Sequence, residues 1–228
     1  MNGSTVWSGK LGRAAPHKFN EPLKWRKPRL VFVNSMGDLF HEDAPREWID
    51  AAFEVMKSCP QHRFQVLTKR HDRMRDYMRD RDPLPNVWLG VSVEDQRRAE
   101  ERLPVLLGTP AAIRFASVEP MLEPVDLRPW LHSLDWVIVG GESGEFLVFS
   151  YAARPFNLAW ARDVLAQCRA AGVPCFVKQM GSIPVDAGER IRLRADKGGD
   201  ITEWPEDISR CESFRNPRAR CRPRITQG

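Results

Sequence analysis

The sequence lacks the features that mark membrane-spanning and disulfide-stabilised proteins. Its longest apolar runs, such as residues 30–33 and 136–139, are too short to cross a bilayer. The polar start Met1–Thr5 leads into no apolar segment of the kind that a secretory signal needs. Five cysteines occur without C-x-x-C or other close spacing, which argues against a disulfide framework or a cysteine metal site. We therefore expect a cytoplasmic protein with free thiols and no membrane contact.

The motifs of several enzyme classes are also missing. The sequence has no H-E-x-x-H zinc motif, no G-x-S-x-G nucleophile motif, and neither glycine-rich loop that binds dinucleotides or nucleoside triphosphates. Its five histidines show no paired spacing. Zinc hydrolysis, serine hydrolysis and binding of those nucleotides therefore have no support, and we predict no metal site.

The net charge of +5 belongs to the end of the chain. Residues 209–228 hold six arginines and one glutamate, so residues 1–208 sum to zero. Such an arginine-rich tail is typical of a disordered, solvated chain end. The alternative is a weak, salt-sensitive contact with nucleic acid or an acidic partner. We divide the chain into an irregular segment over residues 1–28, one domain over residues 29–208, and this tail.

Strand and helix patterns alternate along the domain. Apolar residues at helical spacing occupy most intervals between the strands, most clearly from Leu158 to Cys168, where Gly172 is placed to end the helix. Pro104 is expected to weaken the second half of an earlier helix. Six short apolar runs end abruptly in polar residues, as strands buried on both faces do; they are 30–33, 64–67, 87–91, 113–116, 136–139 and 175–177.

This alternation predicts an α/β fold with a parallel sheet. Six strand–helix units are too few for a complete eight-stranded barrel. The pattern is therefore compatible with two folds, a partial barrel or a doubly wound open sheet. In both folds the active site lies at the C-terminal ends of the strands.

Chargeable residues follow every predicted strand, and we expect them to gather along that rim. One alternative is the ordinary polarity of strand ends, with Glu94 capping the helix that follows it. Gly140 and Gly141 follow a buried strand, where they allow either close approach of a ligand or a plain turn. The chargeable set consists of Asp38, Lys69, Arg70, Glu94, Glu119, Glu142 and Lys178.

The strand-end motifs, taken in order, resemble one protein family. They are Val33–Glu42, Leu67–Arg70, Trp88–Glu94, Ser117–Leu122, Val139–Gly144 and Phe176–Gly181, followed by Asp196–Asp200 and Glu203–Pro205. The family is phage-associated and radical-SAM-like, a domain of unknown function found beside three-Cys-motif partner proteins. The resemblance covers about Val6 to Pro205.

The resemblance implies a partial (β/α) barrel of about six parallel strands, of the radical-SAM or TIM-barrel type. In full-length relatives it also implies S-adenosylmethionine and a [4Fe–4S] cluster that three cysteines hold, leaving one iron open to the cofactor. Those cysteines precede the segment matched by Trp7 and Pro22–Trp25, whereas this sequence has no cysteine before Cys59. The resemblance therefore implies a chain truncated or inactive for cluster chemistry. Residues 145–153 also lengthen the loop before Arg154 relative to the family.

The resemblance implies that the rim binds the methionyl and ribose parts of a nucleoside cofactor, or another substrate. The alternatives are a non-catalytic binding module for a phage or host partner, and a cluster-free barrel enzyme that acts on a small anionic metabolite. The candidate ligand-binding residues are Asn34, Ser35, Asp38, Lys69, Arg70, Glu94, Glu119, Gly140, Gly141, Glu142, Arg154, Lys178 and Gln179.

Overall fold

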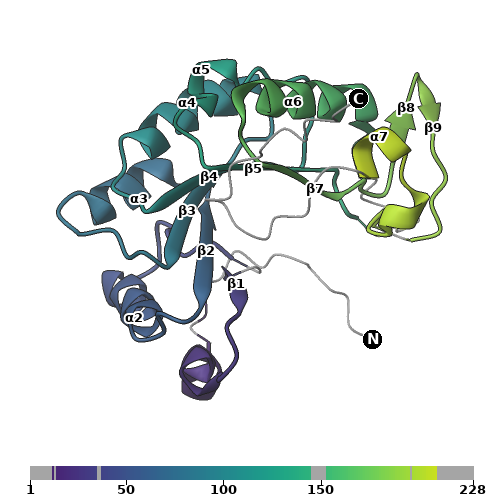
Figure 1. The fold of residues 1–228 in the computed structure, drawn as a ribbon. Coiled ribbons are helices and arrows are strands. Elements are labelled where there is room, and N and C mark those ends of the chain that lie inside the picture. Colours follow the sequence, from purple (N-terminus) through teal and green to yellow (C-terminus); the bar gives the residue numbers. More distant parts are fainter. Residues whose placement is uncertain (1–11, 13, 35–36, 145–152, 196, 210–228) are drawn as a thin grey trace, which may run out of the picture.

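The computed structural model describes residues 12, 14–34, 37–144, 153–195 and 197–209, and its main feature is a curled parallel sheet (Figure 1). The order of the strands follows the chain without reversal, whereas a doubly wound sheet would reverse at a switch point. The expected partial (β/α) barrel is therefore confirmed, as are all six predicted strands. The strands are β1 (Leu30–Val33), β2 (Arg63–Thr68), β3 (Val87–Ser92), β4 (Ile113–Val118), β5 (Trp136–Gly140) and β7 (Cys175–Gln179).

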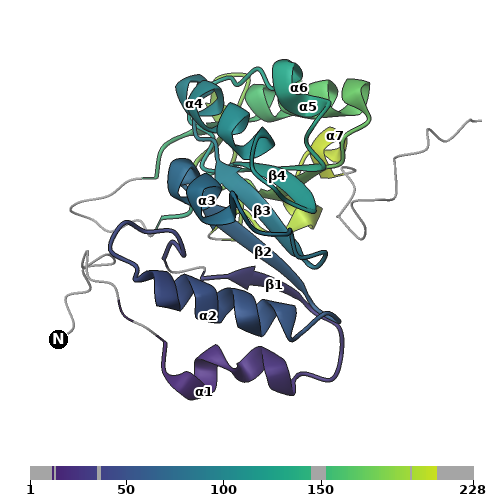
Figure 2. The ribbon, with the colours of Figure 1, turned by 90° about the vertical axis from the view of Figure 1, so that its left-hand side faces the viewer.

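Helices cover the convex face of this sheet (Figures 1 and 2). Gly172 ends α6 with φ of 68°, as its position in the sequence predicts. Pro104 does not shorten its helix, because buried Leu103 and Leu106 hold both sides of the proline against the core. The covering helices are α2 (Arg46–Lys57), α3 (His71–Met78), α4 (Gln96–Leu107), the single turn α5 (Arg128–Leu131) and α6 (Leu158–Ala171).

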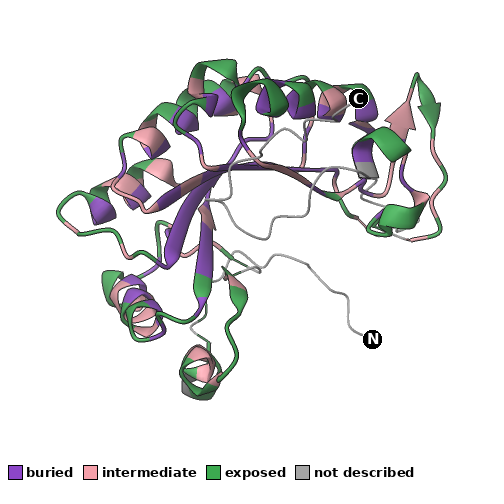
Figure 3. Cartoon of the chain, viewed as in Figure 1, coloured by how far each residue is buried: buried purple, intermediate pink, exposed green. Residues whose placement is uncertain are grey.

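Both faces of the sheet are apolar, which explains the near-continuous apolar runs in the sequence. The convex face belongs to the main core with the helices, and β2 to β5 are largely buried (Figure 3). The concave face carries a second cluster with Trp88, Phe115 and Trp136 at its centre. The rings of Trp88 and Trp136 meet edge to face at 5.9 Å. Gly90 lies beneath Phe115, whose ring would be 2.5 Å from a Cβ atom at that position.

Short elements flank the two ends of the sheet. The N-terminal α1 (Pro16–Phe19) and η1 (Glu21–Lys24) lie beside α2 (Figure 2). Beyond β7 a small sheet combines β6 (Phe156–Asn157), β8 (Pro184–Asp186) and β9 (Glu189–Arg190), and η2 (Ile201–Glu203) and α7 (Glu206–Ser209) follow it. The arginine-rich tail from residue 210 onward is outside the described residues. Among those that are described, no helix has both the length and the apolar character to span a bilayer.

Candidate ligand-binding rim

The rim is the row of side chains at the C-terminal ends of the six strands, and Asp38 anchors its first part. The Asp38 carboxylate accepts hydrogen bonds from Thr68 Oγ1 at 2.7 Å, from the Lys69 main-chain N–H at 3.0 Å and from the Phe40 main-chain N–H at 2.9 Å. These contacts bind the segment after β1 to the end of β2. Because three donors already occupy its oxygens, Asp38 orders the rim itself, and we assign it a supporting position.

Arg70 extends this network outward. Its Nη1 is 3.4 Å from Asp38 Oδ2, and its Nε donates to Glu42 Oε2 at 2.9 Å. The hydrogen bond from Arg70 lowers the pKa of Glu42 to about 2. Asn34 directly follows β1 and lies in the left-handed region with φ of 55°, and its carbonyl oxygen accepts from the Gly37 N–H at 3.0 Å. Ser35, another predicted candidate, is outside the described residues.

A buried carboxylate lies between two cations after β3. Glu94 is 8% exposed, and its oxygens meet Lys69 Nζ at 2.5 Å and Arg102 Nη1 at 2.9 Å. Burial raises the pKa of Glu94, but the Lys69 hydrogen bond and the Arg102 charge outweigh it, so the pKa lies below its usual range. The helix cap that follows is Asp95, which accepts from the Arg98 N–H at 2.7 Å. Glu94 is therefore an ion-pair partner and not the cap of α4.

A second ion pair crosses over the end of β5. Lys178 Nζ on β7 donates to both oxygens of Glu119, which follows β4, at 3.0 and 3.1 Å. Between them lies Gly140, where a Cβ atom would be 3.1 Å from Glu119 Cδ. The absence of a side chain at Gly140 thus lets carboxylate and ammonium meet from strands that are not neighbours. The Lys178 side chain remains 52% exposed, so its ammonium group is open to a ligand.

Gly141 allows a close approach by the protein's own main chain. A Cβ atom there would be 2.4 Å from the Met180 carbonyl oxygen, and the Gly141 N–H donates to the Gln179 carbonyl oxygen at 3.0 Å. The Gln179 side chain in turn donates to the Gly141 carbonyl oxygen at 3.0 Å. These contacts join β5 to β7 at the rim.

Glu142 and Arg154 meet despite the long loop between them. Glu142 accepts from the main-chain N–H, Nε and Nη2 of Arg154 at 2.9, 2.8 and 2.9 Å. This hydrogen bonding lowers the pKa of Glu142 below its usual range, and the charge of Lys69 adds to the effect.

The described candidates therefore assemble into a central group and a supporting group. The central group has the ion pairs Lys69–Glu94 and Glu119–Lys178, with Gly140 between the latter; the supporting group fixes strand ends. Arg102 and Thr68 also contribute, although the sequence pattern alone predicts a role for neither. Arg102 lies on the buried face of α4. An arginine in an otherwise apolar stripe of a helix indicates a buried ion pair, and this feature is visible in the sequence. Thr68 was hidden within the motif Leu67–Arg70, and no separate signal marked it.

A comparison with models of protein families shows to which family the chain belongs. The model of a family described as "Protein of unknown function (DUF5131)" matches residues 2–206. The chain belongs to this family. The DUF5131 match includes every strand of the curled sheet and every rim residue described above. The comparison with curated proteins and the comparison with solved structures gave no match.

The described cysteines of this DUF5131 chain do not fit a [4Fe–4S] cluster. Cys59 lies just beyond α2, Cys168 lies in α6, and Cys175 begins β7 at the end opposite the rim. Within the described part of the chain, no three His, Cys, Asp or Glu side chains are grouped so that they could hold a metal ion. The other two, Cys211 and Cys221, are outside that part.

Proposed function

We propose that the rim of this half-barrel binds S-adenosylmethionine, and that the chain is a radical-SAM-like, phage-associated protein that does not carry out cluster chemistry by itself. The observation that best supports cofactor binding is the Glu119–Lys178 pair across Gly140, because its ammonium group is half exposed while its carboxylate is largely sheltered. The phage association, and a three-Cys-motif partner protein, rest on the resemblance of the strand-end motifs alone.

The methionyl end of S-adenosylmethionine carries an ammonium group and a carboxylate on one carbon atom. This zwitterion is complementary to the Glu119–Lys178 pair, since its carboxylate can accept from Lys178 while its ammonium group donates to Glu119. The protein's ion pair separates slightly to admit the ligand, and each charge exchanges one partner for another. No buried charge is left unpaired in the exchange.

The ribose hydroxyl groups of the cofactor are hydrogen-bond donors, and the second central pair offers an acceptor for them. Glu94 is ionised at neutral pH because Lys69 and Arg102 hold its pKa down. Its Lys69 partner is 51% exposed, so a ribose hydroxyl can take the place of Lys69 at the Glu94 carboxylate while the ammonium group turns to solvent. We assign Glu94 the role of ribose acceptor and Arg102 the role of positioning Glu94.

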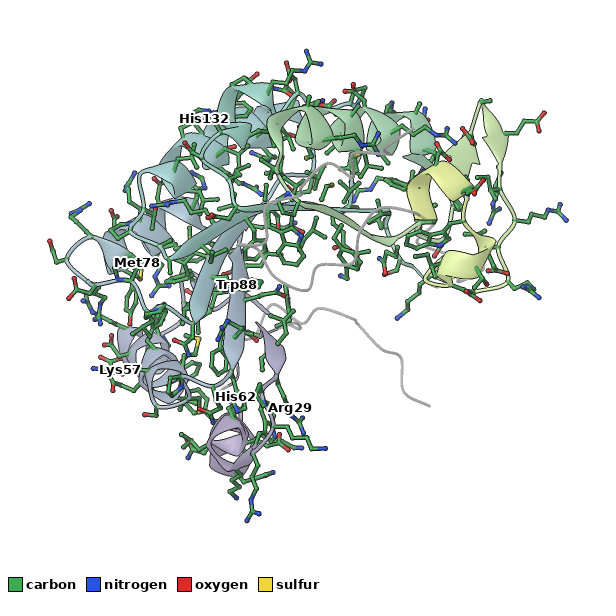
Figure 4. All side chains as sticks on the ribbon, in the orientation of Figure 1. Arg29, Lys57, His62, Met78, Trp88 and His132 are labelled. Carbon is green, nitrogen blue, oxygen red and sulfur yellow. The ribbon has the colours of Figure 1, made fainter. Side chains whose placement is uncertain are left out.

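Isothermal titration calorimetry of the 228-residue chain with S-adenosylmethionine tests this proposal. We expect one saturable site. Lys178→Met should weaken binding by about tenfold or more, because one charge-assisted hydrogen bond contributes about 1.5–3 kcal/mol. Lys57→Met is the matched control, since Lys57 is an exposed lysine at the end of α2, on the convex side of the sheet (Figure 4). Absence of saturable heat with the unmodified chain, or equal losses in both variants, would contradict the proposal.

A further inference from the structure

The outer edge of β1 presents unpaired main-chain groups. Among the described residues β2 is the only strand beside β1, which ends the sheet on that side (Figure 1). The Arg29 carbonyl oxygen accepts from the Arg63 N–H at 2.8 Å, and the Arg29 N–H donates to His62 Nδ1 at 3.2 Å, so Arg29 faces β2 with both groups. Successive residues of a strand face opposite sides. Leu30 and Phe32 therefore direct their N–H and C=O groups away from the sheet, and no described residue hydrogen-bonds to them there.

Exposed apolar side chains accompany this edge. Of the four large apolar side chains that are exposed in the described part of the chain, Leu30 and Phe32 lie on β1 and Leu23 lies in the adjacent η1. Leu30 is 51% exposed and Phe32 is 42% exposed, whereas β2 to β5 are largely buried (Figure 3). Proteins usually protect an edge strand with charged residues, proline or a covering segment, and the residues of β1 itself include none of these.

A cavity runs beside the same edge. It has a volume of about 310 Å³ and lies between β1, the N-terminal helical segment and α2. Its walls are mainly apolar, and among the residues that form them are Val31, Val33, Trp25, Leu39, Trp48 and Ala52. A strand laid along β1 would direct alternate side chains into this cavity and the others over Leu30 and Phe32.

The surroundings of the edge are positively charged. Residues 17–29 contain five lysines and arginines but one carboxylate, Glu21. One of these cations, Arg29, stacks over the ring of Trp25 at 4.5 Å and lies close to His62 near β1 (Figure 4). A second copy of this chain would bring the same cations against one another. An acidic partner segment would instead be attracted.

We propose that the outer edge of β1 binds an extended segment of another protein, apolar at alternate positions and flanked by acidic residues, which adds to the sheet as a further strand. Main-chain hydrogen bonds to Leu30 and Phe32 supply affinity, and the cavity selects an apolar side chain. The basic segment over residues 17–29 attracts the acidic flanks and sets the salt dependence of binding. This inference is independent of the rim and its ligand.

A synthetic peptide tests the edge directly. The probe is acetyl-Glu-Glu-Val-Thr-Val-Thr-Val-Glu-Glu-amide, and the readout is amide hydrogen exchange of the full chain followed by NMR. We expect the probe at saturation to slow exchange of the Leu30 and Phe32 amides by about tenfold or more. A version with lysine in place of every glutamate should bind about tenfold more weakly, since charge attraction becomes repulsion. Absence of protection, or equal binding of both peptides, would overturn the proposal.

Two variants locate the binding site on the protein. Phe32→Glu should abolish the protection, because it removes the apolar contact and repels the acidic probe, whereas Ile201→Glu, at a side chain that is 50% exposed in η2, should leave it unchanged. If Phe32→Glu does not fold, Lys27→Glu takes its place, because this charge reversal lies outside β1. It should weaken binding of the acidic peptide and strengthen binding of the lysine peptide. If Lys27→Glu still preferred the acidic peptide over the lysine peptide to the same extent, the basic segment would be ruled out as the recognition element.

Discussion

Single glycines decide how closely the strand ends approach one another. Gly141 has space for no side chain, since a Cβ atom would lie 2.4 Å from the Met180 carbonyl oxygen and 2.9 Å from the Gly181 nitrogen. Both of those atoms belong to the main chain, which cannot rotate away as a flexible side chain would. The glycine is thus a requirement of the β5–β7 junction itself.

Gly141→Ala should therefore destabilise the protein by about 1–3 kcal/mol, as overpacking of a dense site does. Equilibrium urea unfolding measures this change. Gly199→Ala is the control, because a Cβ atom there would meet nothing within 4 Å, and its effect should stay within about 0.5 kcal/mol. Equal destabilisation by both substitutions would show that the close approach at Gly141 is relaxed at little cost.

Glu94 is the residue at which charge and stability are most closely linked. Removing its charge leaves Arg102 buried without a counter-ion, so Glu94→Gln should lower the free energy of unfolding by about 3 kcal/mol at neutral pH. Its pKa in the folded state lies below the ordinary value of 4.5. The stability that its charge contributes is therefore complete above that value, and it is lost as the pH falls through the folded-state pKa.

Urea unfolding of the wild type and of Glu94→Gln over a series of pH values tests this linkage. The difference between the two should be constant from neutral pH down to about pH 4.5 and should shrink below it. Glu100→Gln, on the exposed face of the same helix, should show only a small difference at every pH. If the wild type remained more stable than Glu94→Gln by the same free energy of unfolding in strong acid, the charge of Glu94 would not be the cause of the difference.

At the scale of elements, Arg162 joins α6 to the small structures beyond β7. Its guanidinium group reaches Asp186 of β8 at 2.5 and 2.9 Å and Asp207 of α7 at 2.5 Å. The hydrogen bonds from Arg162 lower the pKa of Asp186. The two carboxylates come from segments far apart in sequence, so one side chain holds both against the same helix.

Arg162→Met should consequently speed amide hydrogen exchange in β8 and α7 while leaving β2 to β5 unchanged. Hydrogen exchange followed by mass spectrometry gives this regional comparison. Arg169→Met, at an exposed position of the same helix, is the matched control and should change neither region. Faster exchange throughout the main sheet would indicate that Arg162 stabilises the whole domain instead of these two elements.

The sequence predicts those strands and helices in which burial sets the pattern of apolar residues. The strands β1, β2, β3, β4, β5 and β7 are apolar on both faces or lie next to such strands, and the long helices present one apolar face. The sequence does not predict the small sheet β6–β8–β9, because its strands are two or three residues long and are held by pairing with distant segments. Such pairing leaves no periodic pattern in the sequence.

Over the whole molecule, the parallel topology brings residues from separate strands to one rim, and the sequence predicts this gathering. The sequence does not predict which charges pair, because the Glu119–Lys178 contact depends on the curl of the sheet and on the empty space at Gly140. The burial of Arg102 beside Glu94 likewise depends on how α4 packs on β3. Periodicity places residues on faces, but tertiary packing selects their partners.

We propose that the C-terminal rim of the half-barrel binds S-adenosylmethionine. The most direct measurement is an NMR titration of the isotope-labelled chain with this compound, following the amide resonances of every described residue. We predict shifts that concentrate at Glu94, Glu119, Gly140 and Gln179, with little change at the opposite strand ends. Absence of shifts at saturating ligand, or shifts centred on the opposite strand ends, such as at Cys175, would show that the rim is not the binding site.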